Sequence, residues 1–176
     1  MFTSTPPPLK LYVCFLPATE ELRNTHWLNR VAAYFGGPSV ATQPMIHTEL
    51  LFAEQSTDSE IIGNSCSIHY NGEVFLESKR FSRTEWHFRE CPWDIDAAME
   101  FCKQHVGERF NHVGYYLNPL CAARMSRNRW FCSEIVAGAL RAAGADVAQS
   151  LHPQRLFESL QEITTPACPR QPPMHF

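Results

Sequence analysis

The strongest constraint on the fold is a β-hairpin pattern between residues 65 and 81. In SCSIHYNGEVFLESKRF, Asn71-Gly72 stands between two runs rich in β-branched and aromatic residues. This dipeptide favours the positive backbone angles of a tight two-residue turn. Three further segments have the composition of strands: 10–16 (KLYVCFL), 45–54 (MIHTELLFAE) and 84–91 (TEWHFREC). The sequence therefore predicts an antiparallel sheet.

Helical patterns flank these strands. Apolar residues recur at helical spacing in segments 18–35, 94–106, 129–144 and 152–163, the last with Pro153 near its start. Segment 110–120 (FNHVGYYLNPL) is predicted as a short helix or turn. Asp94 is the expected N-cap of the second helix, and the expected helix ends are Gly36-Gly37, Gly107 and Gly144. Strands with flanking helices predict an α+β fold with helices packed on the sheet.

The length of 176 residues suits one domain with a sizeable core. We expect a single domain over 1–176, with its core at about 10–162 and irregular proline-rich ends at 1–8 and 164–176. The net charge of −3 offers no basic excess for nucleic acid or an anionic membrane. No segment is long enough to span a bilayer and no signal peptide is recognised, so we expect an intracellular protein. Nothing in the sequence predicts the oligomeric state.

Seven cysteines are spread along the chain, at positions 14, 66, 91, 102, 121, 132 and 168. Their number is odd and they form no CxxC pair, whereas a secreted disulfide framework favours an even number in a shorter chain. We therefore expect reduced thiols, several of them buried as small hydrophobic side chains.

One of these thiols, Cys132, stands where the predicted helix 129–144 should begin. Unpaired backbone N–H groups and aligned peptide dipoles at a helix N-terminus stabilise a thiolate. Trp130 and Phe131 would anchor the incoming chain, and small residues at 137–139 would let the helix lie close to a sheet. The sequence leaves two interpretations open for Cys132, an inert buried thiol or a nucleophile.

A thiol nucleophile needs a base, and His47 is the candidate. It lies in an apolar strand, where an imidazole is costly to bury without a partner. Alternation along this strand places Met45, His47, Glu49 and Leu51 on one face and Ile46, Thr48, Leu50 and Phe52 on the other. Glu49 can therefore orient the imidazole, and His69 in the next strand is the alternative.

Metal binding has weaker support. Cys102 and His105 would share a helix face, but Cys66 and His69 would point to opposite faces of their strand. Structural zinc sites need four ligands, usually with tighter paired spacing. We therefore predict no metal and no other cofactor.

The order of these features resembles the circularly permuted NlpC-type branch of the papain-like cysteine hydrolases, which includes YiiX-like and lecithin–retinol-acyltransferase-like proteins. The matching residues are HWLNRVAAYFGG, HTELLF, SCSIHYNGEVFLESKRF, EWHF, HVGERFNHVGYYLNP, RWFCSEIVAGAL and HPQRLFESL, which cover roughly residues 10–162. The chain departs from the family at Phe110-Asn111, where a tyrosine–aspartate pair is common.

The resemblance implies a papain-like fold with the nucleophile helix on the central sheet. It implies Cys132 as nucleophile, His47 as base, and Glu49 or alternatively His69 as the third residue. We also expect Trp130, His112 and Tyr115 to contact substrate, Glu134 to support the helix dipole, and the basic cluster 124–129 to be a solvated loop or a contact for a carboxylate-bearing substrate.

The reaction implied is attack of the thiolate on a carbonyl, through a thioester. A cysteine peptidase or amidase acting on a peptide or amide is the first expectation. A lipid acyltransferase or thioesterase of the same fold, acting on an acyl substrate, is the alternative. A binding or structural protein without turnover is the rival from another class, because a fold does not prove an activity.

Overall fold

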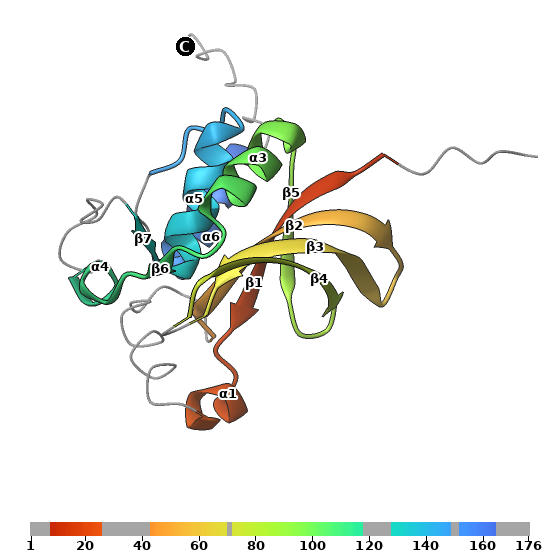
Figure 1. Cartoon of the computed structure of the whole chain (residues 1–176). Coiled ribbons are helices and arrows are strands. Elements are labelled where there is room, and N and C mark those ends of the chain that lie inside the picture. Colours follow the sequence, from red (N-terminus) through yellow and green to blue (C-terminus); the bar gives the residue numbers. More distant parts are fainter. Residues whose placement is uncertain (1–7, 26–42, 70–71, 118–127, 149–151, 165–176) are drawn as a thin grey trace, which may run out of the picture.

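A five-stranded antiparallel sheet with the order β4-β3-β2-β1-β5 forms the centre of the molecule (Figure 1). The computed structural model describes residues 8–25, 43–69, 72–117, 128–148 and 152–164. The strands are β1 (Lys10–Pro17), β2 (Met45–Ser56), β3 (Glu60–Ile68), β4 (Val74–Ser82) and β5 (His87–Cys91). All neighbouring pairs are antiparallel, which confirms the α+β class and the sheet predicted from the sequence.

Three longer helices lie together on one side of this sheet (Figure 1). They are α3 (Ile95–His105), α5 (Cys132–Ala142) and α6 (Pro153–Thr164). Helix α5 packs against β2 and β3, α3 packs against α5, and α6 packs against β2. Helix α5 therefore connects the sheet to both other helices, and the predicted packing of this helix on the sheet is confirmed.

Smaller elements complete the described part of the chain. Helix α1 (Glu20–Thr25) follows β1, and α4 (His112–Leu117) confirms the short helix predicted at 110–120. Strands β6 (Arg109–Phe110) and β7 (Arg129–Trp130) form a parallel ladder, which the sequence did not predict. The ladder brings the end of the α3 segment to the residues that lead into α5. No described helix has the length and apolar character needed to cross a membrane.

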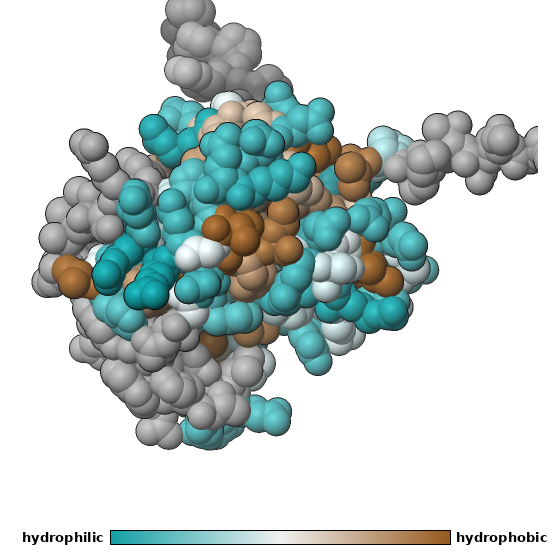
Figure 2. Space-filling view, viewed as in Figure 1, coloured by the Kyte–Doolittle hydropathy of each residue, from teal (hydrophilic) through white to brown (hydrophobic). Residues whose placement is uncertain are grey.

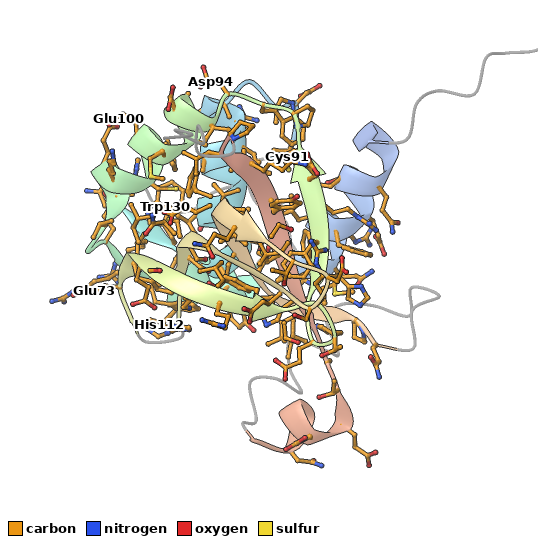
Figure 3. All side chains as sticks on the ribbon, turned by 90° about the vertical axis from the view of Figure 1, so that its right-hand side faces the viewer. Glu73, Cys91, Asp94, Glu100, His112 and Trp130 are labelled. Atoms are coloured by element: carbon orange, nitrogen blue, oxygen red, sulfur yellow. The ribbon has the colours of Figure 1, made fainter. Side chains whose placement is uncertain are left out.

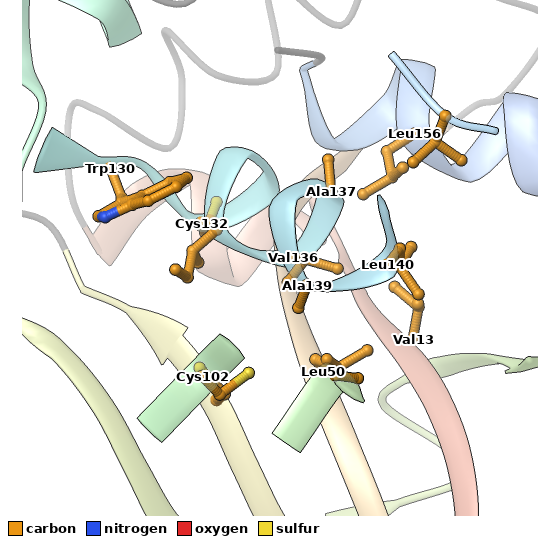
Figure 4. Close-up of a cluster of buried hydrophobic side chains, with 14 of the residues drawn as sticks. Val13, Leu50, Cys102, Trp130, Cys132, Val136, Ala137, Ala139, Leu140 and Leu156 are labelled. Carbon is orange, nitrogen blue, oxygen red and sulfur yellow. The ribbon is translucent and has the colours of Figure 1, made fainter. Parts of the chain in front are cut away.

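Alternation along the strands builds two cores. The larger one lies between the sheet and the helices, where Val136, Ala139 and Leu140 of α5 face Val13 and Leu50 (Figure 4). The smaller one lies on the opposite face and consists of Tyr12, Cys14, Leu51, Ala53, Ile61 and Phe81, with Trp86 and Phe88 against them. Full burial of one such aliphatic or aromatic side chain contributes about 1.5–3 kcal/mol.

The helix predicted in segment 129–144 begins at Cys132, as expected. Arg129 and Trp130 belong to β7, Phe131 is the extended N-cap residue (φ −118°, ψ 169°), and Cys132 is the first helical residue. Trp130 and Phe131 are each 1% exposed, and an extended backbone buries two successive large side chains on opposite sides. The predicted end at Gly144 is confirmed by its φ of 96°.

The other helix limits follow the sequence closely. The side chain of Asp94 accepts a hydrogen bond from the Ala97 N–H at 3.0 Å, which confirms the predicted N-cap of α3. Gly107 has a φ of 87°, which a residue with a side chain rarely adopts, and it follows the end of α3 as expected.

Three strand predictions need correction. The β3–β4 connection covers 69–73, because Ile68 already pairs with Val74, and Gly72 is not among the described glycines with positive φ. The strand expected at 84–91 starts at His87, since 83–85 form the turn after β4. Met45 packs with Leu50 rather than on the Glu49 face, because a bulge pairs Leu16 with His47 but Pro17 with Met45.

Some predictions fall outside the described residues. These are the helix beyond Thr25 with Gly36-Gly37, the turn residue Asn71, the segment 118–127, Cys121, Cys168 and most of the two proline-rich ends.

Candidate active site

Cys132 lies at the start of α5, next to Trp130 (Figure 4). The first N–H groups of a helix have no carbonyl four residues before them, and together with the helix dipole they favour a negative charge. The residue is 6% exposed, so a group that contacts its sulfur is largely shielded from bulk water. Its position therefore suits a thiolate that reacts in a restricted space.

His47, near the start of β2, is the partner of Cys132. Burial alone would lower the pKa of His47, but the charge of Cys132 and a side-chain hydrogen bond with it, followed by the same two interactions with Glu49, raise that pKa to about 10. The Nε2 atom lies 3.2 Å from Oε1 of Glu49, so its N–H donates to the carboxylate. The imidazole thus joins the sulfur to the carboxylate and is held in its protonated form.

Glu49 is 2% exposed and carries three donors. Besides His47, Ser65 Oγ donates to Oε2 at 2.7 Å, and Lys79 Nζ lies 3.2 Å from each carboxylate oxygen. Burial would raise the pKa of Glu49, but the bond to His47 and its charge, the bond from Ser65 and the charge of Lys79 lower it to about 2. The carboxylate is therefore ionised and fixed in one orientation.

His69, the alternative third residue, occupies a different position. Its ring stacks on His47 with centroids 5.8 Å apart and planes inclined by 19°, and it stacks on Phe75 at 4.8 Å. Burial, and then the charges of His47 and Lys79, lower the pKa of His69. His69 thus covers one face of the His47 ring, while Glu49 accepts the hydrogen bond from the ring nitrogen Nε2.

The contacts around the imidazole close into a ring of side chains. Lys79 Nζ lies 4.2 Å above the ring of Phe75, which leads through His69 back to His47. All of these side chains except His69 come from β2 and β4. Each of them limits the movement of the next, so the imidazole is held from its face as well as from its nitrogen.

A groove of about 580 Å³ lies at the β4–β5 turn, on the other side of Trp86 from the His47 ring that this residue contacts. Trp86 lines the groove and also contacts His47 edge-on, with ring centroids 6.2 Å apart. Leu16, Pro17 and Thr19 at the end of β1 form another part of its wall. The groove therefore offers mixed polar and apolar space beside Trp86, the residue that connects it to the imidazole.

The residues predicted to contact substrate are separated by the structure. Trp130 is buried against Phe101 and His105, and its indole N–H donates to Glu108, so its side chain lies in the core and not on an open surface. Tyr115 is half-buried between the rings of Phe110 and Phe131.

His112 and Glu134 occupy two further positions. His112 lines a separate polar hollow beside β6 and β7. Glu134 is fully buried in the first turn of α5, where Asn111 Nδ2 donates to it at 3.4 Å. Asn111, which stands at the departure from the family pattern, thus contacts the first turn of α5.

The other described thiols have different surroundings. Burial raises the pKa of Cys14 well above its usual value and that of Cys91 to about 12. A hydrogen bond with Cys66, together with burial, raises that of Cys102. All five described cysteines are free and buried, which confirms the expectation for these residues. What distinguishes Cys132 from them is its histidine neighbour and not its exposure.

Ser65 and Lys79 were not predicted from the sequence. The sequence does contain a signal for Lys79. Alternation along β4 places it on the same inward-facing side as Phe75 and Phe81, where a lysine needs a partner of opposite charge. Ser65 left none, since serine is ordinary in a strand.

Within the described residues, no three His, Cys, Asp or Glu side chains are grouped so that they could hold a metal ion. Comparison of the chain with protein-family models, with curated proteins and with solved structures found no match.

Proposed function

We propose that this protein is a papain-like thiol hydrolase of the permuted NlpC type, with Cys132 as nucleophile, His47 as acid and base, and Glu49 as the orienting carboxylate. The observation that carries the proposal is the position of the His47 imidazole, which interacts with Cys132 on one side and lies 3.2 Å from the buried Glu49 carboxylate on the other. A nucleophile, its base and a group that orients the base are the parts that covalent acyl transfer requires.

In the first half-reaction, the Cys132 thiolate attacks the substrate carbonyl carbon and forms a carbon–sulfur bond. The negative oxygen that results lies near the N-terminus of α5, where the N–H of Cys132 is a donor. The His47 imidazolium gives its proton to the leaving amine as the carbon–nitrogen bond breaks. The products of this step are a free amine and a thioester on Cys132.

In the second half-reaction, neutral His47 takes a proton from water while the water oxygen attacks the thioester. The carbon–sulfur bond breaks, the carboxylic acid leaves, and the thiolate–imidazolium pair is restored. Glu49 keeps the imidazole oriented through both steps and stabilises its positive charge. We place a peptide or amide bond first among the substrates, with the groove beside Trp86 holding one side of it.

The test is the reactivity of all seven cysteines toward iodoacetamide at about pH 7, followed by mass spectrometry of the peptides. Cys132 should react fastest, because the thiolate is the reactive form and the positively charged His47 imidazole lies beside the sulfur. His47→Ala should slow the labelling of Cys132 by about tenfold or more. His87→Ala, which removes an exposed imidazole on β5, is the matched control and should leave the rate unchanged.

Turnover is tested separately, with a panel of peptide, amide, ester and thioester probes and with Cys132→Ser as the blank. Release of product with the wild type alone supports a hydrolase. If Cys132 reacts no faster than the buried thiols and no probe is turned over, the protein keeps the fold without the chemistry and the proposal fails.

A further inference from the structure

The segment that leads to the nucleophile carries an unusual charge. Residues 109–129 contain four arginines and no lysine, aspartate or glutamate, in a chain whose net charge is −3. The arginines are Arg109, Arg124, Arg127 and Arg129. The structure describes the first and the last of them. A stretch of +4 just before Cys132 thus stands out from an acidic chain.

The β6–β7 ladder places Arg109 directly beside Arg129. Like charges in opposed positions of a ladder destabilise it unless an opposite charge lies near them. Glu73 Oε1 lies 4.0 Å from Arg109 Nε, at the outer limit of an ion pair. Among the residues whose side chains the structure describes, none forms an ion pair with Arg129.

These arginines border a polar hollow of about 390 Å³. Its lining is Gly72, Glu73, Arg109, Phe110, His112 and Arg129. Glu73 and His112 lie at the same corner of the molecule (Figure 3), where the surface over β6 is mainly hydrophilic (Figure 2), and Val113 of α4 is an exposed apolar residue beside it. The hollow thus holds two guanidinium groups and an imidazole against a single carboxylate.

The hollow adjoins the candidate active site on two sides. Arg129 precedes Cys132 by three residues, so their Cα atoms are at most about 11 Å apart. On the other side, the Gly72 N–H donates to the carbonyl of His69 at 2.9 Å, and the His69 ring stacks on His47. A substrate that spans about 10 Å is therefore long enough to place one group in the hollow and a carbonyl at the sulfur.

We propose that the hollow between Arg109, Arg129 and His112 binds a carboxylate or phosphate group of the substrate whose carbonyl Cys132 attacks. The guanidinium fork matches the paired oxygens of both anions, and such charge-assisted bonds are stronger than neutral ones. The bound anion would also supply the opposite charge that the ladder lacks. The inference rests on the proposed function for the identity of the nucleophile. The effect of the arginine charges on an anion is measured without any assumption about turnover.

Iodoacetate and iodoacetamide form a suitable pair of probes, because they alkylate the same sulfur and differ in the carboxylate. The quantity to measure is the ratio of their rates at Cys132, at constant ionic strength. His47 attracts the anion in every variant, so only the change from the wild-type ratio reports on the arginines. Removal of one positive charge about 10 Å away should lower the ratio by about two- to fivefold.

We therefore expect a lower ratio of the iodoacetate rate to the iodoacetamide rate in Arg109→Gln and in Arg129→Gln. In the double variant the ratio should fall by about tenfold if the two effects multiply. Arg129→Lys keeps the charge and should retain most of the preference. Arg80→Gln, which removes an exposed arginine paired with Glu60 far along β4, is the matched control. Iodoacetamide alone should react at the same rate in all of them.

Competition identifies where the anion comes from. Protection of Cys132 by inorganic phosphate, lost in the double variant, assigns a soluble carboxylate or phosphate substrate. Protection by phosphatidylserine vesicles but not by phosphate or phosphatidylcholine vesicles assigns an anionic lipid headgroup. Both outcomes support an anion site and choose between its sources.

An unchanged ratio in the double variant, an equal fall in Arg80→Gln, or no protection by either probe overturns the inference. Failure of the proposed function looks different, because both reagents would then leave Cys132 no more reactive than the buried thiols. A variant that does not fold is recognised by circular dichroism, and Arg129→Lys then decides between a charge effect and a structural one.

Discussion

Lys79 Nζ lies 3.2 Å from each of the two carboxylate oxygens of Glu49, and the contact joins β4 to β2 across the intervening β3. The lysine side chain is 24% exposed and the glutamate side chain 3%, so the pair is shielded from water. Breaking a buried pair on one side is costly, because the remaining charge is left without a partner. Lys79 therefore holds the carboxylate that orients His47.

Lys79→Met should weaken Cys132 reactivity through Glu49. The charge of Lys79 contributes to the low pKa of Glu49, so its loss raises that pKa and lets the carboxylate take up a proton at higher pH. The acid limb of the iodoacetamide profile should move up by about one pH unit. Near neutrality Glu49 stays ionised, and the rate should fall there by about three- to tenfold because the carboxylate loses the contact that fixes its orientation. Lys79→Arg keeps the positive charge and should retain most of the wild-type rate. A profile matching that of Lys103→Met, an exposed lysine on α3, would rule this role out.

Glu49→Gln and His69→Phe separate the two candidates for the third residue. Glu49→Gln removes the negative charge that faces His47 Nε2, so the pKa of His47 should fall below about 10. The alkaline limb of the iodoacetamide profile should then move to lower pH. Loss of an orienting partner of this kind costs about 10- to 100-fold in comparable sites. His69→Phe keeps a ring stacked on His47 and should cost less than about threefold. The reverse ranking would make His69 the orienting residue.

Local sequence was enough to place Cys132, His47 and Glu49. A helix-start thiol and two strand residues at i and i+2 are patterns of short range, and the structure joins them as expected. Ser65 and Lys79 depend on which strands are neighbours and in what register. That information lies in pairings such as Leu50 with Cys66 and Gly63 with Lys79, which form between segments distant in the chain.

The differences in the fold have the same origin. Trp130 was expected at the substrate, but pairing of β7 with β6 turns it inward onto α3. Met45 changed face because of a bulge opposite Pro17, and alternation in one strand contains no information about a bulge in its neighbour. The β3–β4 turn differs because pairing ends at Ile68 and Val74, and the Asn71-Gly72 dipeptide did not set its length.

Stability should be highest between about pH 4.5 and 6.5. The pKa of Glu49 is lowered from 4.5 to about 2, so its contribution is present above 4.5 and is lost as the pH falls toward 2. The pKa of His47 is raised from 6.5 to about 10, so its contribution is complete below 6.5 and is lost as the pH rises toward 10. The shift of the Glu49 pKa alone contributes about 3 kcal/mol to the free energy of unfolding in this range.

Urea unfolding from about pH 3 to 10 measures this profile. Glu49→Gln should lose most of the decline on the acid side, because the titrating carboxylate is absent. Cys132→Ser should lose part of the decline on the alkaline side, because the sulfur no longer raises the pKa of His47. Parallel profiles for the wild type and both variants would show that these three groups are not coupled.

Gly138→Ala should destabilise the protein through α3 and not through the sheet. A Cβ at this position would lie 2.7 Å from Cζ of Phe101 and 3.3 Å from Cζ3 of Trp130, so the small residue lets α5 approach α3. Overpacking of this kind costs about 1–3 kcal/mol. Phe101→Leu removes the obstructing end of the ring, and the double variant should regain part of the loss in a urea-unfolding cycle. Additive losses would mean that the helix shifts as a whole, in which case Gly138→Ala should also slow Cys132 alkylation, since the sulfur moves with the first turn of α5.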